Sequence, residues 1–334
     1  MGGGGYCLPQ YTFNQQYILL KQCTPSTCLV EACGQIKYIP SLGGNVVYMA
    51  MFLVLLISQL YLCIRHKTFG FLVGMFGGIA LEVLGYGGRI WLNRSIFNFN
   101  GFLLYLICLT IAPAFLSGSI YICLGRLVNV NGQHLSRFSA KTYAIVFVSS
   151  DLLSLVLQAA GGALAAQANT NSQQQTGINI MIAGLAYQVF SLLLFLALWG
   201  EFALRIRRAS EDQKNPEYIA LRASNKFKYF QFALFLATIL ILIRSTYRVI
   251  ELQGGFKGTI ANDQPSFMVL EGPMIILAIL ALTVFHPGLV LKDAWHASGF
   301  SFHSNKGGAV EYQMTAKGND DYSSNSELRG ASFR

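Results

Sequence analysis

Seven long apolar runs constrain this 334-residue chain more than any other feature of its sequence. A helix needs about 20 mostly apolar residues to cross the hydrocarbon core of a bilayer, and each run has about that length. The composition agrees, since 53% of the residues are hydrophobic and only 12% are charged. We therefore expect an all-α, multi-pass membrane protein whose seven transmembrane helices cover residues 43–64, 70–92, 101–124, 142–166, 177–204, 229–250 and 265–290.

The distribution of Lys and Arg between the loops predicts the orientation, because cytosolic loops carry an excess of these residues. With the N-terminus outside, the external segments hold only Lys21, Lys37, Arg94 and Lys257. The cytosolic segments then hold Arg65, Lys67, Arg126, Arg137, Lys141, Arg205, Arg207, Arg208, Lys214, Arg222, Lys226, Lys228, Lys292, Lys306, Lys317, Arg329 and Arg334. This asymmetry predicts an extracellular N-terminal segment (1–42), a transmembrane domain (43–290) and a cytosolic tail (291–334). The tail is rich in Ser, Asn and Gly, and we expect it to be disordered.

The N-terminal segment contains four cysteines, and the outside of a cell is oxidising, so two disulfides are expected there. The candidates are Cys7, Cys23, Cys28 and Cys33. The sequence leaves all three pairings open, with four free thiols as the alternative. A glycosylation sequon begins at Asn93, but it adjoins the end of the second helix, so we expect it to lie too close to the bilayer for modification.

The second predicted helix carries Glu82, Tyr86 and Arg89. Spacings of four and seven residues place these side chains on one helical face. A charge at membrane depth costs about 2.5–3.5 kcal/mol on insertion scales, so this face is expected to point into the helix bundle. A stripe of glycines four residues apart begins at Gly70 on the same helix, and such a stripe lets a neighbouring helix approach closely.

Other predicted helices carry polar side chains at membrane depth as well: Asp151 and Gln158 in the fourth, Gln188 in the fifth, Arg244, Tyr247, Arg248 and Glu251 in the sixth, and Glu271 in the seventh. At a rise of 1.5 Å per residue, the arginines and Glu271 fall in the outer half of the bilayer. Glu82 falls near its middle and Asp151 in its inner half. We infer a polar, partly water-filled interior lined by the second, fourth, fifth, sixth and seventh helices. A substrate pathway is the favoured interpretation, and ion pairs that only hold helices together are the alternative.

Several functions lack support in the sequence. There is no phosphate loop for an ATP-driven pump, and no nucleophile motif of a serine hydrolase. His286 is the single histidine at membrane depth, near the cytosolic end, and we expect it to be a capped interfacial side chain and not a metal ligand. We therefore expect no enzyme, no cofactor and no nucleic-acid partner, and protein partners stay open.

The polar residues also form ordered motifs: Glu82-x-x-Gly85-Tyr86-x-x-Arg89, Asp151 with Gln158-x-x-Gly161-Gly162, Gly184-x-x-x-Gln188, Arg244-x-x-Tyr247-Arg248-x-x-Glu251, Glu271-Gly-Pro and His286-Pro-Gly. In this order, over residues 43–290, they resemble the fungal RTA-like lipid-translocating exporter family. The resemblance implies seven transmembrane helices and a fungal plasma-membrane protein. It also implies membrane lipids and amphiphiles as partners, through export of sphingoid long-chain bases or tolerance of toxic sterols and drugs. It brings no catalytic residues.

Two other functions compete with a lipid exporter. A receptor-like lipid or stress sensor would share the external N-terminus and the basic loop at 205–228, although this is a likeness of architecture alone. A scaffold or regulator would use the buried charges only to pack its helices.

Overall fold

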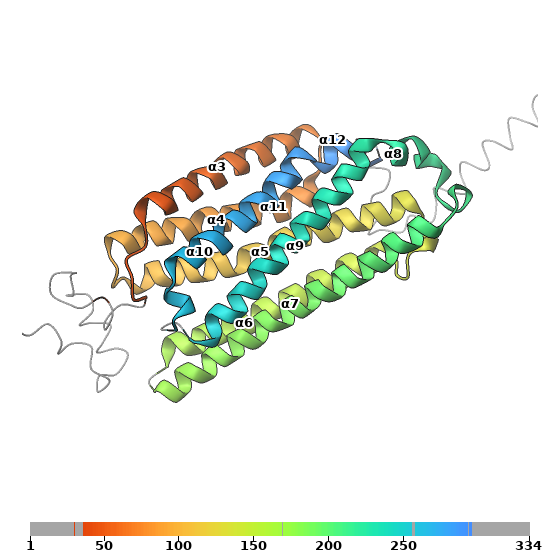
Figure 1. Cartoon of the computed structure of the whole chain (residues 1–334). Coiled ribbons are helices and arrows are strands. Elements are labelled where there is room, and N and C mark those ends of the chain that lie inside the picture. The colour runs from red at the N-terminus through yellow and green to blue at the C-terminus, as the bar shows by residue number, and fades with distance from the viewer. Residues whose placement is uncertain (1–29, 31–35, 169, 256–257, 293, 296–334) are drawn as a thin grey trace, which may run out of the picture. The chain divides into compact units, whose positions relative to one another are not determined.

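The structure, a computed structural model, describes residues 30, 36–168, 170–255, 258–292 and 294–295. Those residues contain seven spans that are long and apolar enough to cross a membrane, which confirms the expected number. The first six are α3 (Leu42–Arg65), α4 (Phe69–Arg94), α5 (Phe99–Asn131), α6 (Ala140–Gln167), α7 (Asn171–Arg208) and α9 (Asn225–Gln253) (Figure 1). The seventh is built from α10 (Gln264–Leu270), α11 (Gly272–Val284) and α12 (Pro287–Leu291). The four N-terminal cysteines and the tail from residue 296 lie outside the described residues.

Short elements join the spans. Between α5 and α6 lies η2 (Gln133–Leu135). The connection from α7 to α9 contains η3 (Glu211–Gln213), η4 (Pro216–Tyr218) and α8 (Ile219–Ala223), and η5 (Ile260–Asn262) precedes α10. The fifth span, α7, runs for 38 residues and is longer than a bilayer requires.

The seventh span is broken twice, whereas the sequence analysis predicted one continuous helix. Proline has no amide hydrogen and its ring clashes with the carbonyl four residues earlier, so it interrupts a helix. Pro273 lies in the first turn of α11, and Glu271 joins α10 to α11 at the break. Pro287 lies in the first turn of α12 in the same way, after a second break at Phe285. The first break places the Glu271 side chain inside the bundle, where it is fully buried.

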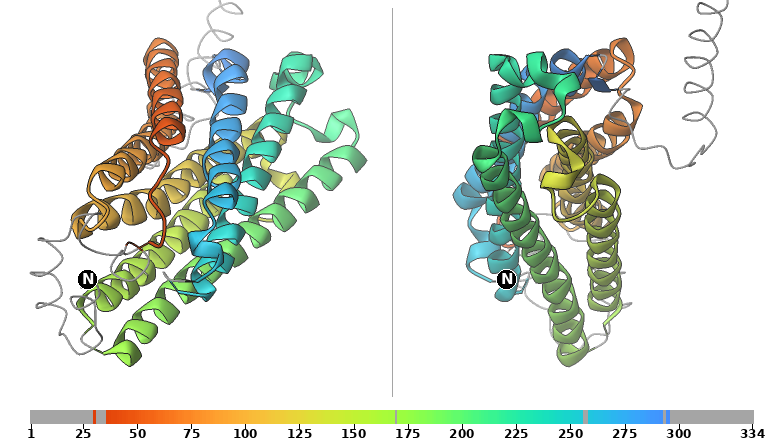
Figure 2. Two further views of the ribbon diagram at one scale, coloured as in Figure 1. Left: turned by 60° about the vertical axis from the view of Figure 1, so that its left-hand side comes forward. Right: turned by 90° about the vertical axis from the view of Figure 1, so that its right-hand side faces the viewer.

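Helix α5 lies at the centre of the bundle. It packs against α4, α6 and α9, while α3 covers α4, α7 covers α6, and α11 lies between α3 and α9. Figure 2 shows α6 and α7, in olive to green, side by side along their length. The apolar window of α5 is 61% buried, against 22% for α3. Large apolar side chains on the outer helices face outward, as lipid contact requires.

Glycines allow the closest helix contacts. A Cβ at Gly74 or Gly78 would lie about 2.6 Å or less from atoms of α5, so the glycine stripe on α4 does face a neighbouring helix. Gly70 has no atom of another residue near its Cβ position, and the stripe therefore begins at Gly74. Between α6 and α7, a Cβ at Gly177 would lie 2.4 Å from the backbone nitrogen of Ala165. Backbone atoms cannot move aside as a flexible side chain does.

We predict that Gly177→Ala destabilises the protein although alanine is the better helix former. The added methyl group would push α6 and α7 apart, and overpacking of this kind typically costs about 1–3 kcal/mol. Gly200→Ala on the same helix is the matched control, because its Cβ would meet nothing within 4 Å. Thermal unfolding of the purified variants in detergent measures the effect. Equal melting temperatures for the two variants would contradict the close contact.

Candidate functional site: a buried arginine cluster

Eight of the eleven predicted pathway residues come together in one place, which we call the arginine cluster. They are Glu82, Tyr86 and Arg89 from α4, Arg244, Tyr247, Arg248 and Glu251 from α9, and Glu271 from the break between α10 and α11. None of them is more than 7% exposed. The expectation that the polar face of α4 points into the bundle is confirmed.

Two arginines of α9 are held by carboxylates. A terminal nitrogen of Arg244 lies 2.6 Å from Glu271 Oε1, and a terminal nitrogen of Arg248 lies 2.6 Å from Glu251 Oε2. Arg248 Nε also lies 3.5 Å from Glu271 Oε1, so one carboxylate contacts both arginines. Charge-assisted hydrogen bonds of this length are the strong class, and buried charges need such partners.

Helix α5 completes the cluster through its polar atoms. Arg244 donates to the backbone carbonyl of Leu109, and Arg248 donates to Thr110 Oγ1 at 3.3 Å. Pro113 lies four residues after Leu109. A proline cannot donate to the carbonyl four residues earlier, so the Leu109 carbonyl is free to accept from Arg244.

Arg89 is bound in a different way. No carboxylate among the described residues forms an ion pair with it; Nε donates to Asn45 Oδ1 at 3.0 Å and a terminal nitrogen donates to Tyr38 OH at 2.9 Å. Its guanidinium lies 3.8 Å from the ring centroid of Phe267 and 5.2 Å from that of Tyr105. Aromatic faces attract a guanidinium electrostatically, so these rings partly replace a counter-ion.

Glu82 is the carboxylate of the cluster that has no partner. Both of its oxygens are buried and neither has a hydrogen-bond partner among the described residues. Next to it on α4, the Tyr86 ring packs against Tyr48 and Phe52, and its hydroxyl is also unpartnered. A Cβ at Gly272 would lie 2.7 Å from that hydroxyl, so only glycine fits there without displacing Tyr86.

The other three predicted residues lie on α6 and α7 in two hydrogen-bonded sets, which we together call the Asp151 group. Ser117 and Tyr121 of α5 donate to Asp151 Oδ2 at 2.6 and 3.0 Å, and Asp151 Oδ1 is buried without a described partner. Gln158 donates to Gln188 Oε1 at 3.1 Å and so connects α6 to α7. This second group is also buried.

Hydrogen bonds and ion pairs among the described residues do not join all the predicted pathway residues into one network. Among the described residues, no hydrogen bond or ion pair joins the arginine cluster to the Asp151 group. The cluster is lined by α3 and α5, which the prediction left out, and the contacts of α6 and α7 belong to the second group. Sequence reasoning missed Asn45, Thr110, Ser117 and Tyr121. Each is a polar residue inside an apolar run, and for Ser117 and Tyr121 the spacing of four residues was an available signal.

His286 lies in the break before α12, where its buried side chain caps that helix. Its Nδ1 accepts from the Gly288 amide at 3.1 Å, while Nε2 lies 3.2 Å from Cys63 Sγ on α3. Within the part of the chain that the structure describes, no group of three or more His, Cys, Asp or Glu side chains could hold a metal ion.

Asn93, the first residue of the glycosylation sequon, lies in the last turn of α4. Its side chain donates to the Pro40 carbonyl.

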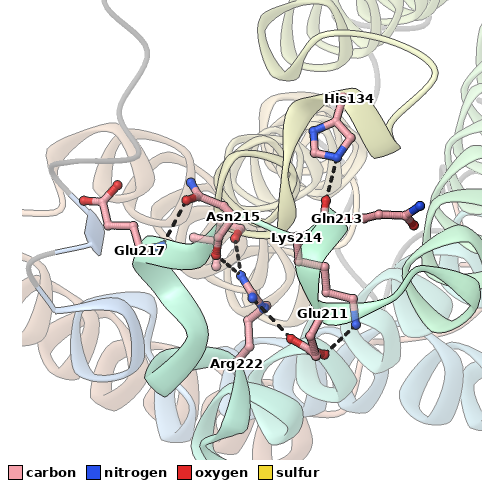
Figure 3. A network of polar contacts seen from close by, with 8 residues as sticks. His134, Glu211, Gln213, Lys214, Asn215, Glu217 and Arg222 are labelled. Atoms are coloured by element: carbon pink, nitrogen blue, oxygen red, sulfur yellow. Dashed lines mark hydrogen bonds and ion pairs between the residues drawn. The ribbon is translucent and has the colours of Figure 1, made fainter.

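The connection between α7 and α9 forms a polar network (Figure 3). Arg222 donates to the carbonyls of Val130 and Asn215, so it satisfies a carbonyl at the C-terminal end of α5. Hydrogen bonds from Lys214 and then Arg222 lower the pKa of Glu211. Beside the network is a cavity of about 590 Å³. No residue of this network was among the predicted pathway residues.

Seven spans around buried, ion-paired charges define a multi-pass membrane protein with a polar interior, the architecture of transporters and of membrane receptors. A family model described as RTA1 like protein matches residues 75–294, which is more than half of the chain. The chain belongs to this RTA1-like family, as its motifs indicated.

Three relatives from Saccharomyces cerevisiae illustrate the family. The sphingoid long-chain base transporter RSB1 is 34% identical over 281 residues, covering 76% of this chain and 73% of that protein. Protoporphyrin uptake protein 1 is 30% identical over 222 residues, covering 66% and 70%. Protein RTM1 is 30% identical over 217 residues, covering 64% and 67%. No solved structure matches the chain. None of these three names describes an enzyme.

We predict that Glu271→Leu destabilises the protein more than Arg244→Met. Removing Glu271 leaves Arg244 without a carboxylate, and breaking a buried pair costs about 3–5 kcal/mol. Removing Arg244 leaves Glu271 with Arg248 at 3.5 Å, so the loss is smaller. Thermal unfolding in detergent tests this order.

Glu201→Leu is the control, because Glu201 pairs with Arg205 and Arg137 at a partly exposed position. Pairs of that kind are worth about 1 kcal/mol or less. If Arg244→Met destabilised the protein more than Glu271→Leu, Glu271 would not be the residue that holds the two arginines together.

Proposed function

We propose that this protein is a transporter that moves sphingoid long-chain bases, or similar single-chain amphiphiles with an ammonium headgroup, across the membrane. The observation that carries the proposal is the buried Glu82 carboxyl of the arginine cluster, which has no hydrogen-bond partner among the described residues. The name of the relative RSB1 supports the substrate class. Buried intramembrane charges mark substrate pathways more often than not.

The cluster offers matching groups for such a headgroup. Arg244 and Arg248 are occupied by their carboxylates, so an ammonium group would find its acceptor at Glu82. The hydroxyls of Tyr86 and Tyr247 are buried without described partners and would serve hydroxyl groups next to the ammonium. Arg89 has no carboxylate partner among the described residues and would receive the anionic group of a zwitterionic lipid. The acyl chain would stay between helices or in lipid.

Asp151 would serve as a second acceptor on the pathway. Its Oδ1 atom is buried and unpartnered, like the oxygens of Glu82, and the two carboxyls lie on helices that pack against α5 from different directions. A headgroup moving across the bilayer would pass from one acid to the other along α5. The broken seventh span supports a transport role, since transporters build their substrate sites on discontinuous helices.

We further propose the topology and location that the Lys and Arg distribution favours: the N-terminus outside, the C-terminus in the cytosol, and residence in the plasma membrane. The arginine cluster would then lie in the outer half of the bilayer, and export of amphiphiles would give tolerance to toxic lipids or drugs. The network around Arg222 would face the cytosol.

We predict protein-dependent translocation of a labelled sphingoid base in liposomes that contain the purified protein. Glu82→Gln removes the negative charge with little change of shape and should lower the rate at least about tenfold, because losing a buried charge contact costs about 2 kcal/mol or more. Glu201→Gln is the control and should transport normally. Absence of flux from folded protein, with several lipids, would refute the transporter and favour the receptor-like sensor.

The proposed topology predicts which loops a membrane-impermeant maleimide reaches in intact cells. In a background with Cys7, Cys23, Cys28 and Cys33 replaced by serine, the exposed position Thr259→Cys should be labelled directly. Gln133→Cys, also exposed, should be labelled only after permeabilisation. The opposite pattern would reverse the orientation.

A further inference from the structure

Headgroup binding alone does not explain how the buried Glu82 carboxyl is accommodated when no headgroup is bound. Each of the other two carboxylates of the arginine cluster, Glu251 and Glu271, has a guanidinium at 2.6 Å. Glu82 has no hydrogen-bond donor among the described residues and is fully buried. An ionised carboxylate without hydrogen bonds is very costly to bury, so in the empty protein Glu82 is held in its neutral, protonated form.

The groups that face Glu82 come from every helix around it. The charged groups are Arg244 and Arg248 on α9 and Glu271 at the break between α10 and α11. Cys108 lies on α5, and Tyr86 lies one helical turn after Glu82 on α4 itself. From α3, the Tyr48 hydroxyl is engaged with the Met268 carbonyl. Arg244 and Arg248 already form ion pairs with Glu271 and Glu251, and their electrostatic attraction to Glu82 is therefore weaker.

The net charge of the arginine cluster determines whether a cationic headgroup can bind there. With Glu82 protonated, three arginines face two carboxylates, and the cluster carries one positive charge. That charge repels an ammonium group, and a neutral carboxyl does not compensate for it. With Glu82 ionised, the cluster is neutral and has a free carboxylate for the ammonium. A cationic headgroup therefore binds only when Glu82 gives up its proton.

We propose that Glu82 exchanges a proton for the cationic headgroup, so that the protein couples amphiphile transport to a proton moving the opposite way. This inference rests on the proposed transport function. The exchange is balanced: an ammonium ion and a Glu82 carboxylic acid give an ammonium–carboxylate pair and one released proton. The cluster carries one positive charge before and after, so no net charge is added to the buried site.

The exchange also identifies a source of energy for transport. A proton gradient across the membrane would drive export, since Glu82 must be reprotonated before the empty site can return. Release of the headgroup would be favoured on the side with the higher proton concentration, because a proton there competes for the same carboxylate.

The first test measures proton release on binding. The purified full-length protein in weakly buffered detergent is titrated with an N,N,N-trimethyl sphingoid base, and a pH indicator reports released protons. This quaternary probe has no proton of its own to lose, so any proton comes from the protein. The wild type should release about one proton per bound probe at a pH where Glu82 starts protonated.

Two variants separate a coupling role from a structural one. Glu82→Gln should release no proton and bind the probe on the order of 30-fold more weakly or worse. Glu82→Asp keeps an exchangeable carboxyl and should still release one. Glu201→Gln should behave as wild type, and melting temperatures check that each variant is folded. Binding of the probe without proton release by the wild type would overturn the proposal, as would undiminished release by folded Glu82→Gln.

The second test distinguishes failure of the coupling from failure of the transport function. Liposomes with the wild-type protein and an imposed pH gradient are supplied with the quaternary probe, with protein-free liposomes as the blank. Translocation that follows the gradient, and moves protons in the opposite direction, supports the exchange. Translocation that ignores the gradient would overturn the coupling and leave the transporter intact. No translocation at all would overturn both.

Discussion

The contact between α9 and the break in the seventh span is the interaction on which the rest of the site depends. Two arginines in the apolar interior require carboxylates at hydrogen-bond distance, because unpaired charges there cost far more than the pairs return. Glu271 meets this requirement for Arg244 from the break between α10 and α11, directly before Gly272 and Pro273. The interruption therefore positions a charge, and the small glycine also leaves room for the Tyr86 hydroxyl.

The number of spans and the inward direction of the polar faces could be predicted from the sequence, because bilayer thickness and the cost of exposing charge to lipid leave few alternatives. Glu82 and Arg89 were assigned to one face by their spacing and to the interior by the cost of a charge at membrane depth, and both are buried. The break at Glu271 was not predicted, although Pro273 was visible, because prolines within membrane helices are often tolerated. Pro113 in α5 is such a case, where the helix continues.

The division into two polar groups could not be predicted, because it depends on which helices are neighbours. Helical periodicity states which side chains share a face, but it does not state which helix that face meets. Asp151 and Glu82 were therefore placed in one interior, whereas α5 lies between their helices. The hydroxyls that bind Asp151 come from this central helix, and its run of apolar residues concealed Ser117 and Tyr121.

The different partners of the three arginines determine the net charge of the arginine cluster. If Arg89 also had a carboxylate, an ionised Glu82 would leave the cluster with a net negative charge, and a neutral Glu82 would leave it uncharged. Arg89 instead lies against the Phe267 and Tyr105 rings with hydrogen bonds to Asn45 and Tyr38, which stabilise a guanidinium without cancelling its charge. One positive charge is thus left over, and the single unpartnered carboxyl of the cluster is the group that can compensate for it. The ring contacts of Arg89 therefore matter for Glu82, because they determine whether an arriving cation meets a neutral site or a repulsive one.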